Sequence, residues 1–494
     1  MAPNSKNYCP NYFNLGNIKR RKIIANFSGG RITSDAGIIL IAELDRKLKI
    51  TSHFAECFQD HRDSAYTNYS VHKLLAQRVY GIVLGYEDVN DHDKLRYDPA
   101  LGIALEKLDF INSKKTGLAG KSTINRLEYC PETILNQQES RYHRIEPDPK
   151  EIEKAFVEIF LASYKKPPRE IVLDMDVTDD QVHGNQEGAF FNPYYHGVCY
   201  APLYIFCGHH LLVAKLRSSN VDTAAEALPE LKRIIGLIRK QWKDTHIIIR
   251  GDSAYSREDI MKWCEQQPRV DYVLAMGTNN QLQLRASDVL EKAKADYETR
   301  LEPVTKLMET FFSPDEEWKE ANNLVPEAIW YRSLCYKTQT SWSQSRRVVT
   351  KVSYGCHGSQ MRHVVTSLPA SKITPSLLYT DKYCPRGEME NRIKEQQLDL
   401  FADRTSTQTF DSNQLRLWLS SMAYVLMQAF RQNCLSKTSF AQATVGTIRL
   451  SFLKLGAKIT ISCRRILIAI ATACPYQDIL GIAYSRIQAI PDSG

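Results

Sequence analysis

The sequence predicts an α/β fold in the middle of the chain, with a mixed β-sheet covered by helices. Two apolar runs, 171–173 and 247–249, are each followed closely by aspartates and have the length of buried strands. Between them, apolar residues recur at the spacing of one helix face from about residue 223 to residue 242. A strand, a helix and a second strand in this order are typical of an α/β sheet.

The remaining elements of this region complete the order. Residues 194–206 and 211–216 predict two strands directly after the first one. Ser256 caps a predicted helix that ends near residue 266, and residues 270–275 predict the next strand. Three closely connected strands followed by helix, strand, helix and strand is the order of a ribonuclease-H-like fold. In that fold the first three strands are antiparallel and the later ones run parallel to the first.

Beyond residue 280 the pattern changes and then returns to the core. A charged helical stretch leads into segments rich in aromatic residues and arginine, 330–334 and 342–354, which predict a β-rich insertion. Residues 363–368 predict a strand that resumes the core. A helix is then expected to begin near Pro385, because proline is favoured in the first turn of a helix.

Both ends of the chain are predicted to be mainly helical. Near the N-terminus, residues 23–27 and 31–33 predict a hairpin closed by a glycine turn, and helices follow at 34–48, 71–85 and 123–135. We divide the chain into five regions. These are a mainly helical N-terminal region for which DNA binding is favoured (1–160), the first part of the core (165–280), the β-rich insertion (281–360), the second part of the core (361–410) and a basic helical C-terminal region (411–494).

Charge is distributed unevenly along the 494 residues, whose formal net charge is +8. Residues 1–34 contain six basic side chains and no acid, and residues 413–477 contain eight and no acid. Such segments suit a polyanion such as DNA, although a charge run is more often only a solvated face. The twelve cysteines have no regular spacing, and the longest apolar run near the end, 466–474, is too short to span a bilayer. We expect reduced thiols and a cytoplasmic protein without a membrane segment.

Four aspartates lie between positions 174 and 180, at the end of the first core strand. Asp174 and Asp176 are two residues apart and would share one face of the strand. Buried carboxylates are normally paired or bind a metal. The alternative is a strand that runs into a turn with solvated acids, and this stretch alone leaves both interpretations open.

Two further acids are expected to join Asp176. Asp252 follows the second core strand, and Glu390 lies on the late helix, where Arg386 and Lys394 share its face. Taken alone, Glu390 fits an exposed, salt-bridged helix better, in which it would pair with Arg386 and Lys394. In a ribonuclease-H-like sheet, however, the two strand ends lie together beside a late helix. Three carboxylates there have the charge to hold two Mg²⁺ ions about 3.5–4 Å apart, which would activate the attacking oxygen and stabilise the leaving one.

Three sequence blocks carry a resemblance to a known family. They are Asp176-Val177-Thr178, then Arg250-Gly251-Asp252-Ser253-Ala254-Tyr255, then Tyr383 and Arg386 ahead of Glu390. In this order they resemble the three acidic blocks of bacterial insertion-sequence DDE transposases. The branch concerned has a third block of Tyr-x2-Arg-x3-Glu-x6-Lys behind a β-rich insertion. Segments 86–91, 183–191 and 389–395 resemble the insertion-sequence 1380 group of that branch, and the likeness extends from about residue 27 into the C-terminal region.

The resemblance implies roles for individual residues. Asp176, Asp252 and Glu390 are the implied ligands of two Mg²⁺ ions, with Mn²⁺ as a substitute. Tyr383 and Arg386 are implied to contact the phosphate next to the cleaved bond.

One position departs from the branch, and one role depends on the insertion. Gln397 stands where the branch has lysine, and Lys394, one turn earlier on the same face, could take over a phosphate contact. The family's insertion carries a tryptophan that stacks on a base flipped out of the transposon end. Trp342 beside Arg346 and Arg347 is the candidate for that role, and a core tryptophan is the alternative.

The implied activity is cut-and-paste transposition. The protein would bind the terminal inverted repeats of its element, hydrolyse the phosphodiester at the ends and join the freed 3′-hydroxyls to target DNA. Its partners would be double-stranded DNA and a second copy of the chain in a synaptic complex. It would act in the bacterial cytoplasm, on the nucleoid.

Two other functions compete with this interpretation. The Asp174-x-Asp176-x-Thr178 pattern also matches haloacid-dehalogenase-like phosphatases, in which Asp174 would form an aspartyl-phosphate and Asp176 would be the general acid. The short spacing to Asp252, the cationic ends and the Tyr-Arg-Glu helix argue against it. The second is a catalytically inactive, transposase-derived DNA-binding protein, against which the retention of all three acids argues.

Overall fold

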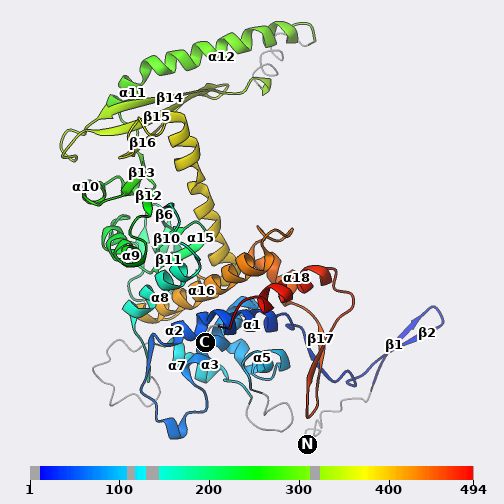
Figure 1. The fold of residues 1–494 in the computed structure, drawn as a ribbon. Helices are drawn as coiled ribbons and strands as arrows, with labels where there is room; N and C mark the ends of the chain where they lie inside the picture. Colours follow the sequence, from blue (N-terminus) through cyan, green and yellow to red (C-terminus); the bar gives the residue numbers. More distant parts are fainter. Residues whose placement is uncertain (1–11, 108–116, 130–143, 312–322, 493–494) are drawn as a thin grey trace, which may run out of the picture. The chain divides into compact units, whose positions relative to one another are not determined.

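The computed structural model describes residues 12–107, 117–129, 144–311 and 323–492. The chain forms two compact units, whose elements are shown in Figure 1. Residues 149–398 and 402–418 form the first, here called the core unit. Residues 1–148, 399–401 and 419–494 form the second, here called the terminal unit because it joins both ends of the sequence.

An eight-stranded mixed sheet organises the core unit. In order across the sheet, its strands are β11 (His210–Lys215), β10 (Leu203–Cys207), β6 (Glu170–Val177), β12 (His246–Gly251), β13 (Val270–Met276), β16 (Gly358–Thr366), β15 (Arg346–Gly355) and β14 (Ala328–Tyr336). β6, β10 and β11 are successive antiparallel neighbours, whereas β12 pairs in parallel with both β6 and β13. This is the strand order of a ribonuclease-H-like core, and the predicted fold class is confirmed.

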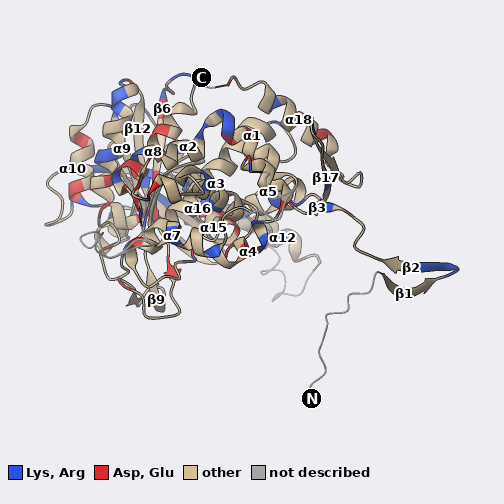
Figure 2. Ribbon diagram, turned by 90° about the horizontal axis from the view of Figure 1, so that it is seen from below, with Lys and Arg blue, Asp and Glu red and all other residues tan. Residues whose placement is uncertain are grey.

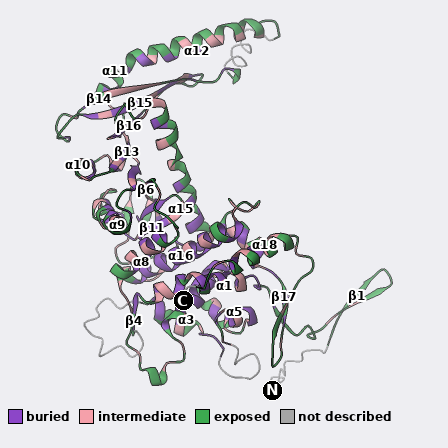
Figure 3. Cartoon of the chain, in the orientation of Figure 1, coloured by how far each residue is buried: buried purple, intermediate pink, exposed green. Residues whose placement is uncertain are grey.

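Alternation along β6 decides which of its side chains face the helices and which face the other side of the sheet. One face packs against three helices, α8 (Pro149–Ala162), α9 (Ala227–Gln241) and α10 (Glu258–Gln266). Leu173 and Met175 are fully buried in the core beneath these helices. Figure 3 shows the buried residues of the chain in purple. Asp174 and Asp176 alternate with them and therefore point to the opposite face, as predicted.

The β-rich segment extends the core sheet instead of forming a separate one. β16 pairs antiparallel with β13, and β15 and β14 follow it toward the edge. Two helices precede these strands, α11 (Asn280–Arg285) and α12 (Ser287–Met308). Buried apolar residues of α12 pack with residues of β14 and β15, and together they form a small hydrophobic core separate from the main one.

The third acidic block lies on a helix, as predicted. Pro385 sits in a 3₁₀ turn, Cys384–Arg386, and α15 begins directly after it and runs from Gly387 to Leu400. The strand predicted at 194–206 is two strands, β9 (Gly197–Tyr200) and β10, with Pro202 between them. A proline has no N–H for a ladder, so it marks the end of one strand and the start of the next.

The terminal unit combines helices with a three-stranded sheet built from both ends of the sequence. That sheet has the order β18 (Ile466–Ile470), β17 (Ala457–Ile461) and β3 (Arg31–Thr33). The two ends pack tightly at Gly37, where a Cβ would lie 1.8 Å from the Phe452 carbonyl oxygen. The helices include α1 (Ile38–Leu48), α2 (Ile50–Ala55), α3 (Val71–Val83), α5 (Pro99–Ala104), α7 (Lys121–Glu128) and α18 (Gln477–Gln488).

One prediction about the ends of the chain was wrong, and a second left out two strands. The N-terminal hairpin pairs β1 (Phe13–Ile18) with β2 (Arg21–Ala25), and Arg31–Thr33 pairs with β17 instead of with residues 23–27. The predicted C-terminal helical region contains the hairpin of β17 and β18. Alternating isoleucines in these two segments favour strands, because β-branched side chains suit a pleated surface. The predicted helix at 123–135 corresponds to α7, and its last residues lie outside the described part of the chain.

No helix within residues 12–107, 117–129, 144–311 and 323–492 combines the length and the apolar character that crossing a membrane requires.

Candidate active site

A buried ion pair joins the ends of β6 and β12. Asp174 and Arg250 are cross-strand neighbours in the parallel register and are only 4% and 6% exposed. Arg250 holds both carboxylate oxygens, with Nη2 donating to Oδ2 at 2.8 Å, and its Nη1 donates to the Lys382 carbonyl at 2.6 Å. Burial raises the pKa of Asp174, and Arg250 opposes that rise. The pair fixes the two strand ends that carry Asp176 and Asp252.

The second acidic block places Asp252 in a tight turn after β12. Its side chain caps a 3₁₀ turn and accepts a hydrogen bond from Ala254 N at 2.9 Å. A Cβ at Gly251 would lie 2.8 Å from the ring of Tyr255 and 3.3 Å from Met175, so only glycine fits there without rearrangement. Tyr255 is fully buried, and its pKa is raised by burial and by nearby carboxylates. The packing of Gly251 against Tyr255 therefore fixes the position of Asp252.

Arg250, Gly251 and Tyr255 belong to the second block of the resemblance, but no role in the site was predicted for them. One signal was available, because a charged residue directly after three isoleucines in a buried strand requires a buried partner. Asp174, on the neighbouring strand, is that partner.

Arg386 connects the first acid with the third. Its Nη2 donates to Asp176 Oδ2 at 2.8 Å, and its Nη1 donates to Glu390 Oε1 at 3.5 Å. Asp176 lies near the end of β6, whereas Glu390 lies in the first turn of α15. The structure therefore brings these two predicted ligands together around one guanidinium.

The charges of Asp252 and Tyr383 interact with those of Asp176, Arg386 and Glu390. Burial raises the pKa of Asp176 to about 6, with Arg386 lowering it and the charges of Asp252 and Glu390 raising it. Burial alone would lower the pKa of Arg386, but the three carboxylates raise it above its ordinary value. Burial raises the pKa of Tyr383, which Arg386 lowers and Asp252 raises further. Five predicted site residues from three distant segments are thus within interacting range.

The residues fit a divalent cation by the chemistry of their donors. Carboxylate oxygens are the ligands that Mg²⁺ prefers. Burial and then repulsion by the other two acids raise the pKa of Asp176, as expected for acids that share a cation. No three His, Cys, Asp or Glu side chains are close enough to hold one ion in the described part of the chain. Instead, Arg386 provides the opposing charge between Asp176 and Glu390.

The departure at position 397 has a clear structural consequence. Gln397 Nε2 donates to the Asp179 carbonyl at 2.9 Å and to Asp180 Oδ1 at 3.0 Å. It therefore ties α15 to the segment that follows β6. Lys394 is exposed on the same helix and forms no ion pair with any carboxylate that the structure describes. Its side chain remains available for a phosphate.

Asp180→Asn is expected to change the pH dependence of stability. Asp180 is fully buried, its Oδ2 has no hydrogen-bond partner among the described residues, and burial raises its pKa to about 8. The folded chain then keeps a proton that the unfolded chain loses near pH 4, so stability from this group is lost as the pH rises from about 4 to about 8. An amide cannot ionise, and it still accepts from Gln397.

Urea unfolding of both proteins at pH 5 and pH 8 measures this effect. We expect the stability of the Asp180→Asn variant relative to the wild type to increase by about 2–4 kcal/mol between the two pH values. A difference that stays constant over this range would show that Asp180 is ionised in the folded chain.

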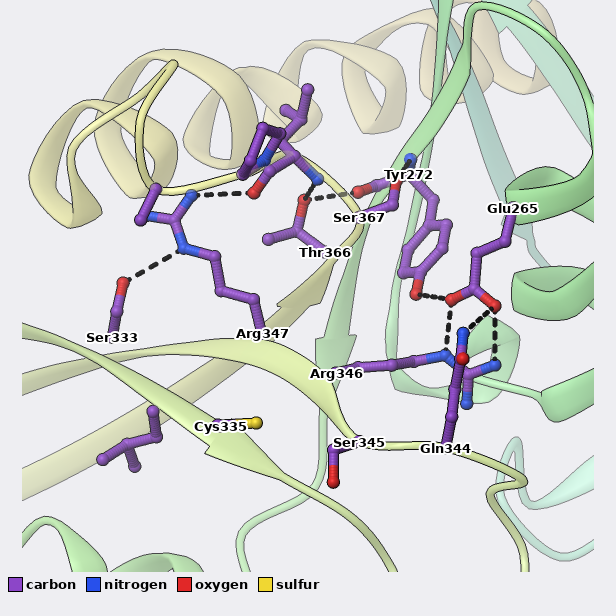
Figure 4. Close-up of a pocket in the computed structure, with 14 residues that line it drawn as sticks. Glu265, Tyr272, Ser333, Cys335, Gln344, Ser345, Arg346, Arg347, Thr366 and Ser367 are labelled. Carbon is purple, nitrogen blue, oxygen red and sulfur yellow. Dashed lines mark hydrogen bonds and ion pairs between the residues drawn. The ribbon is translucent and has the colours of Figure 1, made fainter.

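Trp342 and Arg346 are engaged within the protein. Trp342 is 5% exposed, and its ring lies edge-on to that of Tyr336 with centroids 5.8 Å apart. Arg346 donates to Glu265 Oε1 and to Glu258 Oε2, each at 2.6 Å, and its guanidinium lies 5.4 Å from the centre of the Trp342 ring. Figure 4 shows Arg346 directed at Glu265. The structure thus shows the core tryptophan considered as the alternative, and stacking on a base stays a prediction.

Arg347 is occupied by backbone acceptors. It donates to the carbonyls of Leu368 and Ile373 at 2.8 and 2.9 Å. It also donates to the Ser333 hydroxyl at 3.1 Å, as Figure 4 shows. Arg346 and Arg347 both line a cavity of about 520 Å³ between β14, β15 and the end of β16. Their contacts support the fold, so a DNA contact by either residue also stays a prediction.

One comparison with known proteins identifies a family for this chain. The family model described as "Transposase DDE domain group 1" matches residues 15–492, which include all three acidic blocks. Among curated proteins, none matches the chain. Among solved structures, the chain is similar to one titled "Cryo-EM structure of piggyBac transposase synaptic complex with hairpin DNA (SNHP)", with 10% identity and a TM-score of 0.39, over 85% of this chain and 80% of that chain.

Proposed function

The chain belongs to the transposase DDE domain group 1 family, and from this premise we propose that it is an active cut-and-paste transposase. It binds the terminal inverted repeats of its own element, hydrolyses the phosphodiester at each end and joins the freed 3′-hydroxyls to target DNA. We further assign it to the insertion-sequence 1380 group of bacteria, on the third block and the flanking segments that resemble that group.

One observation carries the proposal. The carboxylates of Asp176 and Glu390 share the guanidinium of Arg386, and the charge of Asp252 adds to the effect of burial in raising the pKa of Asp176. These residues come from the first core strand, a neighbouring strand and a late helix. Two acids that share one guanidinium, with a third whose charge acts on the first, support a functional use of these residues.

We assign Asp176, Asp252 and Glu390 as the residues that would hold two Mg²⁺ ions, with Mn²⁺ as a substitute. When bound, the ions would supply a polarised attacking oxygen and would stabilise the leaving oxygen. Two interactions position the carboxylates before a metal binds. Asp252 is held by the hydrogen bond that it accepts from Ala254 N, and the strand that carries Asp176 is held by the ion pair of Asp174 with Arg250.

Arg386 has two tasks in this proposal. In the DNA-free chain it neutralises Asp176 and Glu390, which would otherwise repel each other. Its guanidinium has two donors that match a phosphate, so it can hold the phosphate beside the cleaved bond once DNA is bound. Tyr383 lies next to it, and Lys394 is one turn beyond Glu390 on α15. These three residues orient the phosphate for in-line attack.

The phosphatase alternative is not favoured. An aspartyl nucleophile must be reachable by a substrate, but Asp174 is 4% exposed and both of its oxygens are held by Arg250. If Asp174 left Arg250 to attack a substrate, the charges of both residues would be buried without a partner, which is costly.

A strand-nicking assay tests the function. Duplex DNA carrying the inverted repeats that flank the coding sequence is expected to be nicked at the repeat ends in Mg²⁺ or Mn²⁺ and to stay intact in EDTA. Duplexes with scrambled ends are the control. Turnover of p-nitrophenyl phosphate without nicking would support a phosphatase instead, and repeat binding without nicking in either metal would indicate an inactive derivative.

The partners follow from the reaction. Two transposon ends must be cut and joined together, so we propose a homodimer on double-stranded DNA, acting in the bacterial cytoplasm on the nucleoid. The acid-free segments at both ends of the sequence suit this polyanionic partner.

A further inference from the structure

The two acid-free ends of the sequence meet in one sheet of the terminal unit. β3 pairs antiparallel with β17 in the register Thr33 with Ala457 and Arg31 with Ile459. Gly30 is close to Lys458, because a Cβ there would lie 3.3 Å from the lysine Cε. Cations from opposite ends of the sequence are therefore assembled on one β-structure.

A first hairpin precedes β3 and carries its charge at the turn. Ile18 and Arg21 pair across it, so Lys19 and Arg20 form a two-residue turn, with Lys19 in the left-handed region at φ 55°. Four consecutive cations, 19–22, form this turn and the start of β2, and all are exposed. β1 and β2 form a sheet of two strands, with no third strand among those described. Such a hairpin is only marginally stable in water by itself, so a binding partner would stabilise it.

A second hairpin follows the same design. β17 and β18 pair in register from Ala457 with Ile470 to Ile461 with Ile466. The turn between them is closed by Ser462 N donating to the Arg465 carbonyl at 3.0 Å. Arg464 and Arg465 are exposed in this turn, and Lys458 is exposed on β17. The terminal unit therefore presents two hairpins, each with a cationic turn.

The charge of this surface is uncompensated. Residues 12–34 and 457–470 contain no aspartate or glutamate. Seven exposed cations form no ion pair with a carboxylate in the described part of the chain: Lys19, Arg20, Arg21, Lys22, Lys458, Arg464 and Arg465. Figure 2 shows the blue segment at the turn of β1 and β2. A polyanion with regularly spaced charges is the complementary partner.

We propose that the two hairpins and the β3–β17–β18 sheet form a duplex-DNA-binding surface, here called the basic β-surface, which binds transposon DNA through its own phosphate contacts. A two-stranded ribbon fits the major groove of DNA, and cations at its turn reach the phosphates on either side. The inference rests on the proposed function, because it assumes that DNA is the substrate. It assigns DNA binding to β-structure from both ends of the chain instead of to helices at one end.

The apolar side chains of the same surface suit a different partner, a second copy of the chain. Ile466, Leu467 and Ile470 are 38%, 49% and 44% exposed on β18, which is an edge strand. An exposed apolar edge can pair with another copy of the chain. The density of unpaired cations favours DNA, and the experiment separates the two.

Binding of the full-length chain to a 40-base-pair duplex of arbitrary sequence tests the inference, with affinity measured against salt concentration. The first variant replaces the four cations 19–22 with serine, and the second replaces Arg464 and Arg465. Every phosphate that a variant no longer binds should lower the slope of log affinity against log salt by about 0.9. We expect the slope to fall by about 2–4 in the first variant and about 1–2 in the second, with affinity at about 0.1 M salt at least tenfold weaker in the first.

A control variant removes the same number of charges elsewhere. It replaces four exposed lysines of the core unit with serine: Lys232, Lys240, Lys243 and Lys262. Its slope should stay close to that of the wild type. Slopes in both hairpin variants that equal the wild-type or control slope would overturn the inference, as would altered self-association in light scattering with an unchanged slope. Failure of the wild type to bind any duplex would instead reject the proposed function.

Discussion

Asp252→Asn is expected to lower strand nicking at transposon ends by at least about a thousandfold. The loss of one carboxylate from the metal-binding set should remove about 4 kcal/mol of transition-state stabilisation, and each 1.36 kcal/mol corresponds to tenfold in rate. The fold should survive, because an asparagine oxygen can still accept the hydrogen bond from Ala254 N that caps the turn. The assay compares single-turnover nicking in Mg²⁺ and in Mn²⁺.

Binding to the same DNA provides the internal comparison for this variant. We expect affinity within about threefold of the wild type, since the affinity is carried mainly by phosphate contacts of basic residues. Asp259→Asn, an exposed acid on α10, is the matched control and should nick at the wild-type rate. Wild-type nicking by Asp252→Asn would remove Asp252 from the catalytic set.

Arg250→Met is expected to lower the free energy of unfolding by about 3–5 kcal/mol. The substitution leaves Asp174 buried without its partner, since Arg250 holds both of its oxygens. It also removes the hydrogen bond to the Lys382 carbonyl, which ties β12 to the segment before α15. Urea unfolding at pH 7 measures the change.

Two further variants separate the buried pair from a general effect of losing arginine. Adding Asp174→Asn to Arg250→Met should recover part of the stability, because the unpaired charge is gone. Arg269→Met removes the partner of Asp244 in an exposed ion pair and should cost less than about 1 kcal/mol. An equal decrease in the free energy of unfolding in the Arg250 and Arg269 variants would show that the buried pair contributes no more to stability than the exposed one.

The order of the core elements could be predicted because its signals are local. The apolar runs that became β6 and β12, and the helical spacing that became α9, each lie within a short window of sequence. The same holds for the placement of Asp176 and Asp252 at strand ends. Given that order, the topology of the fold fixes which strands are neighbours, and the sheet order follows.

Other features depend on pairings that no local pattern reveals. Nothing in residues 31–33 indicates that their partner is β17 near the other end of the chain. The ion pair of Arg250 with Asp174 requires the register of two strands, and the hydrogen bond of Gln397 with Asp180 requires the position of a helix against a loop. Trp342 is similar: a tryptophan beside two arginines looks equally suited to stacking on a base or to a protein core, and only packing decides.

The position of bound metal tests the shared site most directly. Anomalous diffraction at the manganese edge, from the full chain crystallised with transposon-end DNA and Mn²⁺, would locate each ion independently of the protein atoms. We expect manganese within about 2 Å of carboxylate oxygens of Asp176, Asp252 and Glu390, with Arg386 turned from Asp176 to a DNA phosphate. Manganese bound elsewhere, with these three carboxylates far apart in the complex, would contradict the proposed catalytic site.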